Sequence, residues 1–466
     1  MLKFARDIIS IMKKSFVFII TLLLSLTIAL VAVPNSAAQN PIVTELWFDP
    51  MHVNDVAVSR NGNYIAAVND TGLFFFLWNQ STPLWWYNNN TNDEQFLSVA
   101  ISADGSYVII GNNSYPPTGP ATGSIYYFGN CTIRAGHQAA DSYNWTSNHF
   151  WGWGTPSVER GTIDMSDNGE YVAVGGTGPN LYMFFNSTTR SGTMLNENWS
   201  IMIEGDVQAL DMSPDGQYVA FGGGEALDGI IAFVIDANTM SHSTVWTAED
   251  LTNGIRDIAI SDDGSAVCAS ARWGDLYYWA NAKALTGNPS STWNSSLNFG
   301  CVGTSSDGDM VVAGSVLFSL HLWDNALARS GSNSPETWTN LYGEDVYDVA
   351  ISDDGKIIAA VMPYGDGPAH VYFFTDQNVT IGNFTEPPYL TMLSMSGDGR
   401  VAAAGGDLED SLHVFYIARE TIVEMKPVGG ELIVLDKLTL LAPYLTLVAL
   451  VAGTAAAGAL LRRRIP

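Results

Sequence analysis

The sequence predicts an all-β fold of eight similar four-stranded units, because one phrase recurs eight times along its 466 residues. The phrase is an apolar run, Ser, one variable residue, Asp or Asn, Gly, and a second apolar run. Its glycines are Gly62, Gly105, Gly169, Gly216, Gly264, Gly308, Gly355 and Gly399. They lie 43, 64, 47, 48, 44, 47 and 44 residues apart, a period typical of an array of supersecondary units.

Strand a of each unit precedes this phrase and strand b follows it. Asp-Gly or Asn-Gly between two apolar runs predicts a tight hairpin, because both residues tolerate positive φ. The aspartates interpreted as turn formers are Asp104, Asp215, Asp263, Asp307, Asp354 and Asp398. A calcium-binding loop is the alternative, but its full spacing and distal Glu are missing from every copy.

Two further strands complete each unit. Strand c is an aromatic and β-branched run: Phe74 to Trp78, Ile125 to Phe128, Leu181 to Phe185, Ile230 to Val234, Leu276 to Trp279, Leu320 to Trp323, Val371 to Phe374 and His413 to Ile417. Strand d carries one aromatic residue before the next phrase: Trp47, Trp86, Trp151 or Trp153, Trp199, Trp246, Trp293, Trp338 and Phe384.

Eight such units resemble the β-propeller superfamily of WD40 and YVTN-type repeats, over about Pro41 to Ala418. The resemblance implies a ring of eight four-stranded blades. Two signatures of WD40 units are sparse here: Gly-His occurs only at Gly136-His137, inside an insertion, and Trp-Asp occurs once in strand c, at Trp323-Asp324. The hydrogen-bond network that those residues build in WD40 proteins is therefore not expected.

The ends of the repeat region predict how the ring closes. Ile42 to Asp49 has the character of strand d, whereas the last unit stops at strand c. We expect the N-terminal strand to complete the eighth blade, since closure removes an open sheet edge. The alternative donor of the missing strand is Thr421 to Met425.

Both ends of the chain predict a membrane protein. Residues 1–38 have the basic start, apolar stretch and small residues of a signal peptide, with an uncleaved anchor as the alternative. The propeller is expected over 39–419 and a stalk over 420–437. Residues 438–461 lack charges and are long enough for a transmembrane helix. Arg462, Arg463 and Arg464 begin the tail at 462–466, which predicts a cytoplasmic C-terminus and an extracellular propeller.

The segment from Pro427 to Tyr444 resembles the membrane-proximal anchor of archaeal surface proteins. Eleven Asn-x-Ser/Thr sequons fit an extracellular glycoprotein: Asn69, Asn79, Asn89, Asn112, Asn130, Asn144, Asn186, Asn198, Asn294, Asn378 and Asn383. From the third unit onward, all of them fall in c-to-d connections or on strand d. The face made by b-to-c and d-to-a connections is therefore expected to be free of glycans there.

Composition bounds the function. Between Gln39 and Lys437 the chain has 46 acidic and 13 basic residues, which argues against nucleic-acid binding. The three cysteines show no metal-binding spacing, and a metal bound by His137 and His149 is a weak alternative. No catalytic motif or phosphate loop is present. No cofactor is predicted, although rim carboxylates could hold a divalent cation.

The b-to-c connections supply the candidate ligand-binding residues, since propellers commonly bind there. These residues are Glu225, Asp228, Trp273, Asp275, Tyr364, Asp366, Asp407 and Asp410. The predicted function is a membrane-anchored, non-catalytic binding module for a protein, peptide or glycan at the cell surface. The alternative is an extracellular hydrolase or lyase in which two rim carboxylates share the acid and base roles.

Overall fold

The computed structural model describes residues 41–419 except 89–93, 115–121, 140–141, 151–161, 177, 226–227, 241–242, 273, 364–367, 387–389 and 407–410. Ile42–Arg419 form one compact unit. The predicted signal peptide, stalk, transmembrane helix and tail lie outside the described residues. Within the described part of the chain, no helix is long and apolar enough to cross a membrane.

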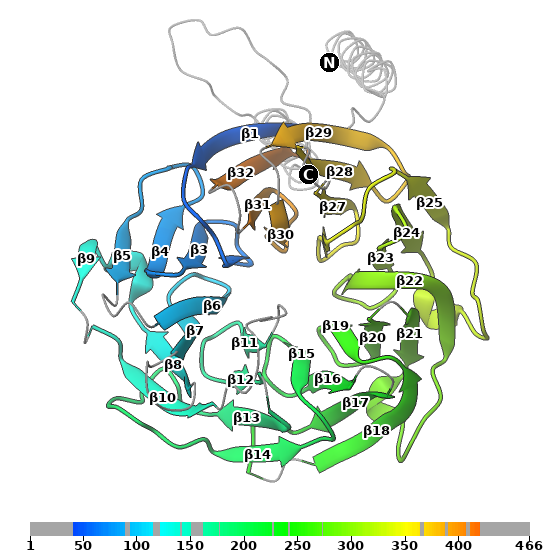
Figure 1. Cartoon of the computed structure of the whole chain (residues 1–466), viewed down its shortest axis with the longest axis horizontal. Coiled ribbons are helices and arrows are strands. Elements are labelled where there is room, and N and C mark those ends of the chain that lie inside the picture. The colour runs from blue at the N-terminus through cyan, green and yellow to red at the C-terminus, as the bar shows by residue number, and fades with distance from the viewer. Residues whose placement is uncertain are drawn as a thin grey trace, which may run out of the picture. The chain divides into compact units, whose positions relative to one another are not determined.

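Seven antiparallel sheets stand around a common axis, the arrangement of a β-propeller (Figure 1). The first holds β2 (Asp55–Val58), β3 (Tyr64–Asn69), β4 (Gly72–Leu77), β5 (Trp85–Asn88) and the parallel β9 (Gly136–Gln138). The second sheet holds β6 (Glu94–Ile101), β7 (Val108–Ser114), β8 (Thr122–Phe128) and β10 (Trp145–Phe150). The third holds β11 (Ile163–Met165), β12 (Val172–Val174), β13 (Asn180–Phe184) and β14 (Trp199–Met202). The fourth holds β15 (Val207–Met212), β16 (Val219–Glu225), β17 (Asp228–Ile235) and β18 (Ser243–Thr252).

A seven-stranded sheet comprises β19 (Ile255–Ile260), β20 (Ala266–Ala271), β21 (Gly274–Ala280), β22 (Trp293–Thr304), β23 (Val311–Ser315), β24 (Ser319–Trp323) and β25 (Trp338–Leu341). It contains two repeats, because the long β22 is both strand d of the fifth unit and strand a of the sixth. The last two sheets hold β26 (Asp348–Ile351), β27 (Ile357–Met362), β28 (Ala369–Thr375) and β29 (Thr380–Glu386), and β30 (Leu390–Met395), β31 (Val401–Gly406), β32 (Ser411–Ala418) and β1 (Ile42–Asp49). Three short 3-10 helices, η1 (Cys131–Ile133), η2 (Ala282–Ala284) and η3 (Ala326–Ala328), follow strands c.

The turn interpretation is confirmed in all eight units. Taking the fourth as the example, the buried Ser213 hydroxyl donates to Asp215 Oδ1 (2.7 Å) and accepts from the Tyr218 N–H (2.9 Å). Gly216 has φ 71°, and a Cβ there would lie 2.6 Å from the Tyr171 side chain of the preceding unit. The Asp oxygen is thus used inside the hairpin, which explains why the motif repeats.

The predicted ring closure is also confirmed. β1 pairs antiparallel with β32, from Ile42 opposite Ala418 to Asp49 opposite Leu412. The first strand therefore completes the sheet of the last unit, and the alternative, a strand from 421–425, lies outside the described residues. The Trp47 indole donates across to the Trp78 carbonyl of the first unit (2.9 Å), which ties the joined ends to the next sheet.

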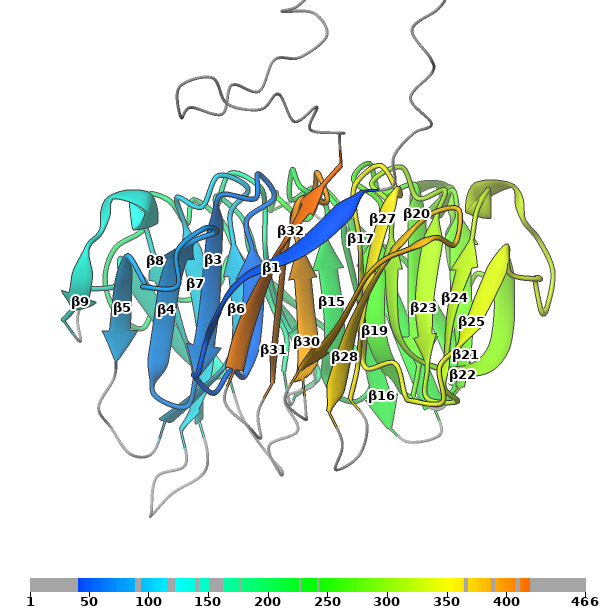
Figure 2. The same cartoon turned by 90° about the horizontal axis from the view of Figure 1, so that it is seen from above.

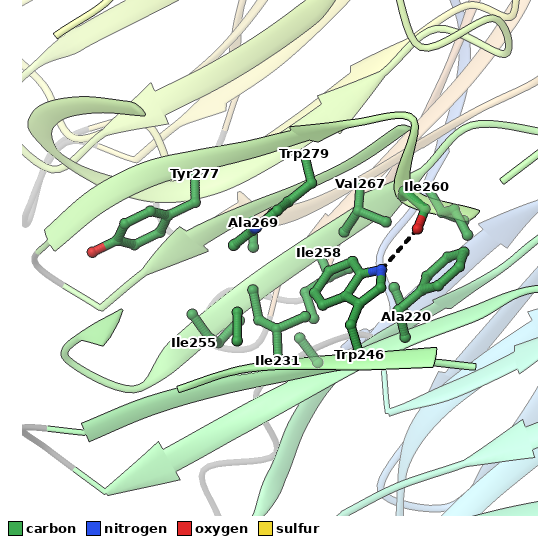
Figure 3. Close-up of a cluster of buried hydrophobic side chains, with 14 of the residues drawn as sticks. Ala220, Ile231, Trp246, Ile255, Ile258, Ile260, Val267, Ala269, Tyr277 and Trp279 are labelled. Carbon is green, nitrogen blue, oxygen red and sulfur yellow. Dashed lines mark hydrogen bonds between the residues drawn. The ribbon is translucent and has the colours of Figure 1, made fainter. Parts of the chain in front are cut away.

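The same indole bond recurs between neighbouring sheets. In seven places, strand d carries a Trp whose N–H donates to the carbonyl just after strand c of the following unit: Trp47 to Trp78 (2.9 Å), Trp85 to Cys131 (2.7 Å), Trp145 to Ser187 (2.9 Å), Trp199 to Ala237 (3.1 Å), Trp246 to Ala282 (2.8 Å), Trp293 to Ala326 (3.0 Å) and Trp338 to Asp376 (3.0 Å). Figure 3 shows the bond of Trp246 within its apolar cluster. The eighth interface has Phe384, which packs against Phe415 at 4.9 Å between ring centroids.

Trp86 lies on strand d as predicted, but at two interfaces the bonded indole is not the aromatic residue named from the sequence. Trp85 occupies the position assigned to Trp86, because successive strand residues face opposite sides and Trp86 is only half-buried. Trp145 occupies the position assigned to Trp151 or Trp153, both of which lie outside the described residues. The error arose because the insertion in the second unit contributes β9, a fifth strand beside β5, and strand d begins directly after it.

Candidate functional site on the two faces of the ring

The connections divide into two faces, seen edge-on in Figure 2. The a-to-b turns and c-to-d connections lie on one, called the turn face. The b-to-c and d-to-a connections lie on the other, called the loop face. Ile42 and Arg419 are both on the turn face, where Arg419 donates to the Asp398 carbonyl and to Asp354 Oδ2 (2.6 Å). The chain therefore leaves the domain on this face at both ends.

At the centre of the turn face, main-chain hydrogen bonds link neighbouring turns into a structure called the collar. Its N–H to carbonyl links run from Asn61 to Ala103 (3.0 Å), Ala103 to Asp167 (2.9 Å), Asp167 to Pro214 (2.8 Å), Asp262 to Ser306 (2.8 Å), Ser306 to Asp353 (2.9 Å), Asp353 to Gly397 (2.8 Å) and Gly397 to Arg60 (2.9 Å). Pro214 has no N–H to donate to the turn of Asp262. The collar holds the turns in place around the axis.

Arg60 bridges three turns of the collar. Its guanidinium bonds Asp353 through Nε (2.9 Å) and Asp167 through Nη1 (3.4 Å), and it also bonds Asp262. Desolvation raises the pKa of Asp167 and of Asp262, against the lowering effect of Arg60, and the other carboxylates add to the rise. One cation thus faces three carboxylates, which leaves this end of the axis acidic.

Aspartates on strand a form a second tier of ties between units. Each accepts from the N–H of its own next residue and from an N–H of the next unit's strand a, at 2.7–3.0 Å: Asp55 from Val56 and Val99, Asp164 from Met165 and Met212, Asp211 from Met212 and Ile260, Asp257 from Ile258 and Val302, and Asp348 from Val349 and Leu393. These carboxylates act as structural bridges near the axis, because they satisfy main-chain donors that lie outside the sheets' own ladders.

Two of these aspartates are close enough to share a proton. The Met212 N–H donates to both Asp164 Oδ2 (2.8 Å) and Asp211 Oδ1 (2.9 Å). Desolvation raises the pKa of Asp164 to about 6, and desolvation together with the charge of Asp164 raises the pKa of Asp211 well above its ordinary value. Like charges this close cannot both ionise cheaply. The pair therefore holds a proton at pH values where isolated aspartates are ionised.

The sequence-predicted binding residues belong to the loop face, but most of them are not described. Trp273, Tyr364, Asp366, Asp407 and Asp410 lie outside the described residues. Glu225 ends β16 and Asp228 begins β17, and they are paired across the hairpin. Asp275 is half-buried on β21, near the loop-face end of that strand. Of these eight residues, the structure describes only the backbone positions of Glu225 and Asp228 and the half-buried Asp275.

The asparagines of the eleven sequons differ in how far they are exposed to solvent. Those whose Asn is exposed are Asn79, Asn130, Asn186, Asn378 and Asn383, all in c-to-d connections or on strand d. Asn69, Asn144, Asn198 and Asn294 are half-buried, and Asn89 lies outside the described residues. Asn112 is buried on β7, with Oδ1 accepting from the Ser124 N–H (2.9 Å). It is therefore inaccessible to glycosylation in the folded domain, which corrects the candidate set.

The histidines and cysteines among the described residues have structural surroundings. His321 is packed in the core and bonded to Ser319 (2.8 Å) and Thr339 (2.9 Å). His137 is exposed on β9 beside Trp86, and the side chain of His149 is outside the described set. Cys131, Cys268 and Cys301 are buried and form no disulfide with one another, and burial raises the pKa of Cys131 to about 12. Among the described residues, no group of three His, Cys, Asp or Glu could hold a metal ion.

Sequence reasoning missed an apolar surface on the loop face of the sixth unit, called the unit-6 patch. It comprises Leu297, Leu317, Phe318, Leu341 and Tyr347, with exposures of 37, 52, 47, 80 and 39%. The available signal was composition. The connection Val316-Leu317-Phe318 consists only of large apolar residues, without a charged or turn-forming residue among the three.

Comparison with known proteins identifies the fold. No protein-family model matches the chain, and no curated protein matches it. Among solved structures it is similar to the C-terminal WD40 domain of Sif2, with a TM-score of 0.57, 14% sequence identity, and coverage of 81% of this chain and 99% of that one. An identity this low shows the fold and not the ligand. The described chain is therefore an all-β protein with a WD40-like β-propeller fold.

Proposed function

We propose that this protein is a non-catalytic binding module, an eight-bladed propeller held at the outer surface of a cell membrane that offers its loop face to a partner. The count of eight follows from assigning two blades to the seven-stranded sheet, one on each half of β22. Propellers of the WD40 type commonly serve protein interaction, which supports the functional class.

The observation that carries the proposal is the asymmetry between the two faces. Every exposed sequon among the described residues lies in a c-to-d connection or on strand d. Ile42 and Arg419, where the chain leaves the domain, lie on the turn face as well. Glycans or a tether attached at these places would leave the loop face open.

The membrane location is supported by the sequence. The apolar segment 438–461 and the arginines after it favour a single span with a cytoplasmic tail, and the leader at 1–38 favours export. The likeness of 427–444 to archaeal surface anchors points the same way. Protease added to intact cells should then remove the propeller, whereas full protection would contradict the proposed orientation.

Binding and catalysis can be separated by one experiment on the full chain in detergent micelles. An array of polysaccharides and peptides is tested for saturable binding, and the same compounds are assayed for cleavage. We expect binding without turnover, weakened more by Trp273→Ala than by Asp366→Asn, since an aromatic anchor is worth more than a rim charge. Met240→Ser, on an exposed c-to-d connection, is the control. Turnover would support the hydrolase or lyase alternative.

A further inference from the structure

We propose that the unit-6 patch binds an apolar segment of a partner protein that carries a Lys or Arg next to its apolar side chains. The inference rests on the proposed function, and it assigns the partner's chemistry and the place on the loop face where it docks. Four observations carry it: the exposure of the side chains, the bonds between the connections that carry them, the backbone strain at Phe318, and two carboxylate oxygens without a hydrogen-bond donor.

The patch concentrates exposed apolar surface. Five of the thirteen exposed large hydrophobic side chains in the described domain belong to it. Large apolar side chains that cluster on a rim of polar loops mark interaction sites, whereas scattered ones do not. Aromatic and aliphatic residues of this size are the usual anchors of a protein interface.

The three connections that carry the patch are bonded to one another. Ser315 Oγ donates to the Leu297 carbonyl (2.6 Å), and the Val316 N–H donates to the Asn298 carbonyl (3.1 Å). On the other side, the Tyr342 N–H donates to the Phe318 carbonyl (2.9 Å). The hairpin tip is thus fixed between the two d-to-a connections, so its side chains are held in place before any partner arrives.

Phe318 sits in a backbone conformation that does not suit it. Its φ is 71°, in the left-handed region that a bulky residue rarely adopts and that glycine occupies without strain. The side chain is nevertheless about half exposed, so packing inside the domain does not explain why Phe is there. Strain retained at an exposed position is typical of a functional contact.

The acidic residues beside the patch indicate the charge of the partner. Glu344 and Asp345 lie in the connection between Leu341 and Tyr347, and each has a buried oxygen, Oε2 and Oδ1 respectively, without a hydrogen-bond partner among the described residues. The other oxygen of Glu344, Oε1, lies 3.7 Å from His370 Nε2. Desolvation raises the pKa of both carboxyl groups, although His370 acts on Glu344 and Arg256 on Asp345 in the opposite sense. A buried acceptor without a donor is costly, and an incoming Lys or Arg would supply the donor.

Charge also selects among the possible occupants. A second copy of this chain would bring the same acidic connection and the same strongly negative domain. An anionic lipid surface would be repelled for the same reason, because the five side chains of the patch include no cation. A cationic apolar polypeptide is the occupant that would cover the exposed apolar area and donate to the two carboxylate oxygens that have no hydrogen-bond partner among the described residues.

The test is a selection of random linear peptides, displayed on phage, on the full chain in detergent micelles. We expect enriched peptides to combine apolar residues with Lys or Arg. Leu317→Ser with Phe318→Gly should weaken the selected peptide at least about tenfold, as expected when central anchors are lost. Glu344→Gln with Asp345→Asn should remove the preference for Lys or Arg but keep the apolar one. Phe318→Gly should leave the melting temperature unchanged or raise it, so that lost binding is not lost folding.

Met240→Ser and Ile133→Ser, which remove exposed hydrophobic side chains outside the patch, are the controls and should bind normally. Peptides that bind equally well to the patch variants would overturn this inference while leaving the proposed function standing. Absence of any selected peptide, together with turnover of a substrate, would overturn both. Self-association, or binding to phosphatidylcholine and phosphatidylglycerol vesicles, that the patch variants reduce would also overturn it by naming a different occupant.

Discussion

The turn face and the loop face are made by connections between the same strands, but the connections repeat one sequence motif on the turn face and vary on the loop face. On the turn face, every unit repeats one hydrogen-bonded hairpin, and neighbouring hairpins join in the collar. On the loop face, the connections differ in length and composition, and one of them exposes Leu317 and Phe318. The comparison teaches that the repeated residues build the ring, whereas departures from the repeat are the places to look for a partner.

The largest effect is expected from opening the ring where its first strand, β1, completes the last sheet. Deleting residues 42–49 removes β1, exposes the edge of β32 and abolishes the Trp47 indole bond. We expect a loss of roughly 3–5 kcal/mol or more in the free energy of unfolding, since the buried Val43, the half-buried Trp47 and the main-chain bonds to β32 are lost together. Thermal or urea unfolding measures it. Phe48→Ser, an exposed position on the same strand, should change little, and an unchanged melt for the deletion would refute the closure.

The next effect separates packing from hydrogen bonding at the sheet interfaces. Trp246→Ala should cost about 3–5 kcal/mol because it opens a cavity in the cluster of Figure 3. Trp246→Phe keeps most of the volume but leaves the buried Ala282 carbonyl without its donor, which should cost about 1–3 kcal/mol. Phe384→Leu serves as the comparison at the interface without an indole. If Trp246→Phe were as stable as the wild type, the repeated indole bond would contribute nothing.

A smaller effect tests the acidic centre of the collar. Arg60→Met removes the one cation that faces Asp167, Asp262 and Asp353. We expect a loss of about 1–3 kcal/mol, less than for a fully buried ion pair because the three carboxylates are partly exposed. Added salt should recover part of it, since screening weakens repulsion among the carboxylates. A variant whose melting temperature is equal to that of the wild type at low salt would show that the Arg60 cluster does not contribute to stability.

The smallest effect concerns pH. Because the folded pKa values of Asp164 and Asp211 are raised above those of the unfolded chain, the native state binds more protons between about pH 4 and their folded values. Their contribution to stability is therefore greatest at low pH and is lost as pH rises through the folded pKa values, which is about 6 for Asp164. Asp211→Asn should flatten this dependence and cost about 1 kcal/mol at all pH values, because the amide has a single oxygen to accept from the Met212 and Ile260 N–H groups. Asp257→Asn, whose carboxylate makes the same pair of main-chain bonds, is the control. A pH profile identical to the wild type would contradict the shared proton.

Sequence reasoning succeeded where the determining interactions are local. The Ser, the Asp or Asn, and the Gly of each turn bond within five residues of one another, so the motif itself predicts the hairpin. Sequence reasoning did not identify Trp85 as the bonded indole of the first unit. Trp85 and Trp86 are adjacent on one strand and differ only in the face to which they point, and that choice is set by the register with β4. Sequence reasoning also failed at the second unit, where an insertion joined a neighbouring sheet.

The sequence by itself determined the repeat, the order of the strands and the closing role of the first one, because period and alternation depend on neighbours in the chain. Only the tertiary structure decided which residues meet across the ring. Arg60 bonds aspartates 107, 202 and 293 residues away, and the unit-6 patch joins side chains from three separate connections. Such contacts depend on the closure of the whole ring, and no local pattern records them.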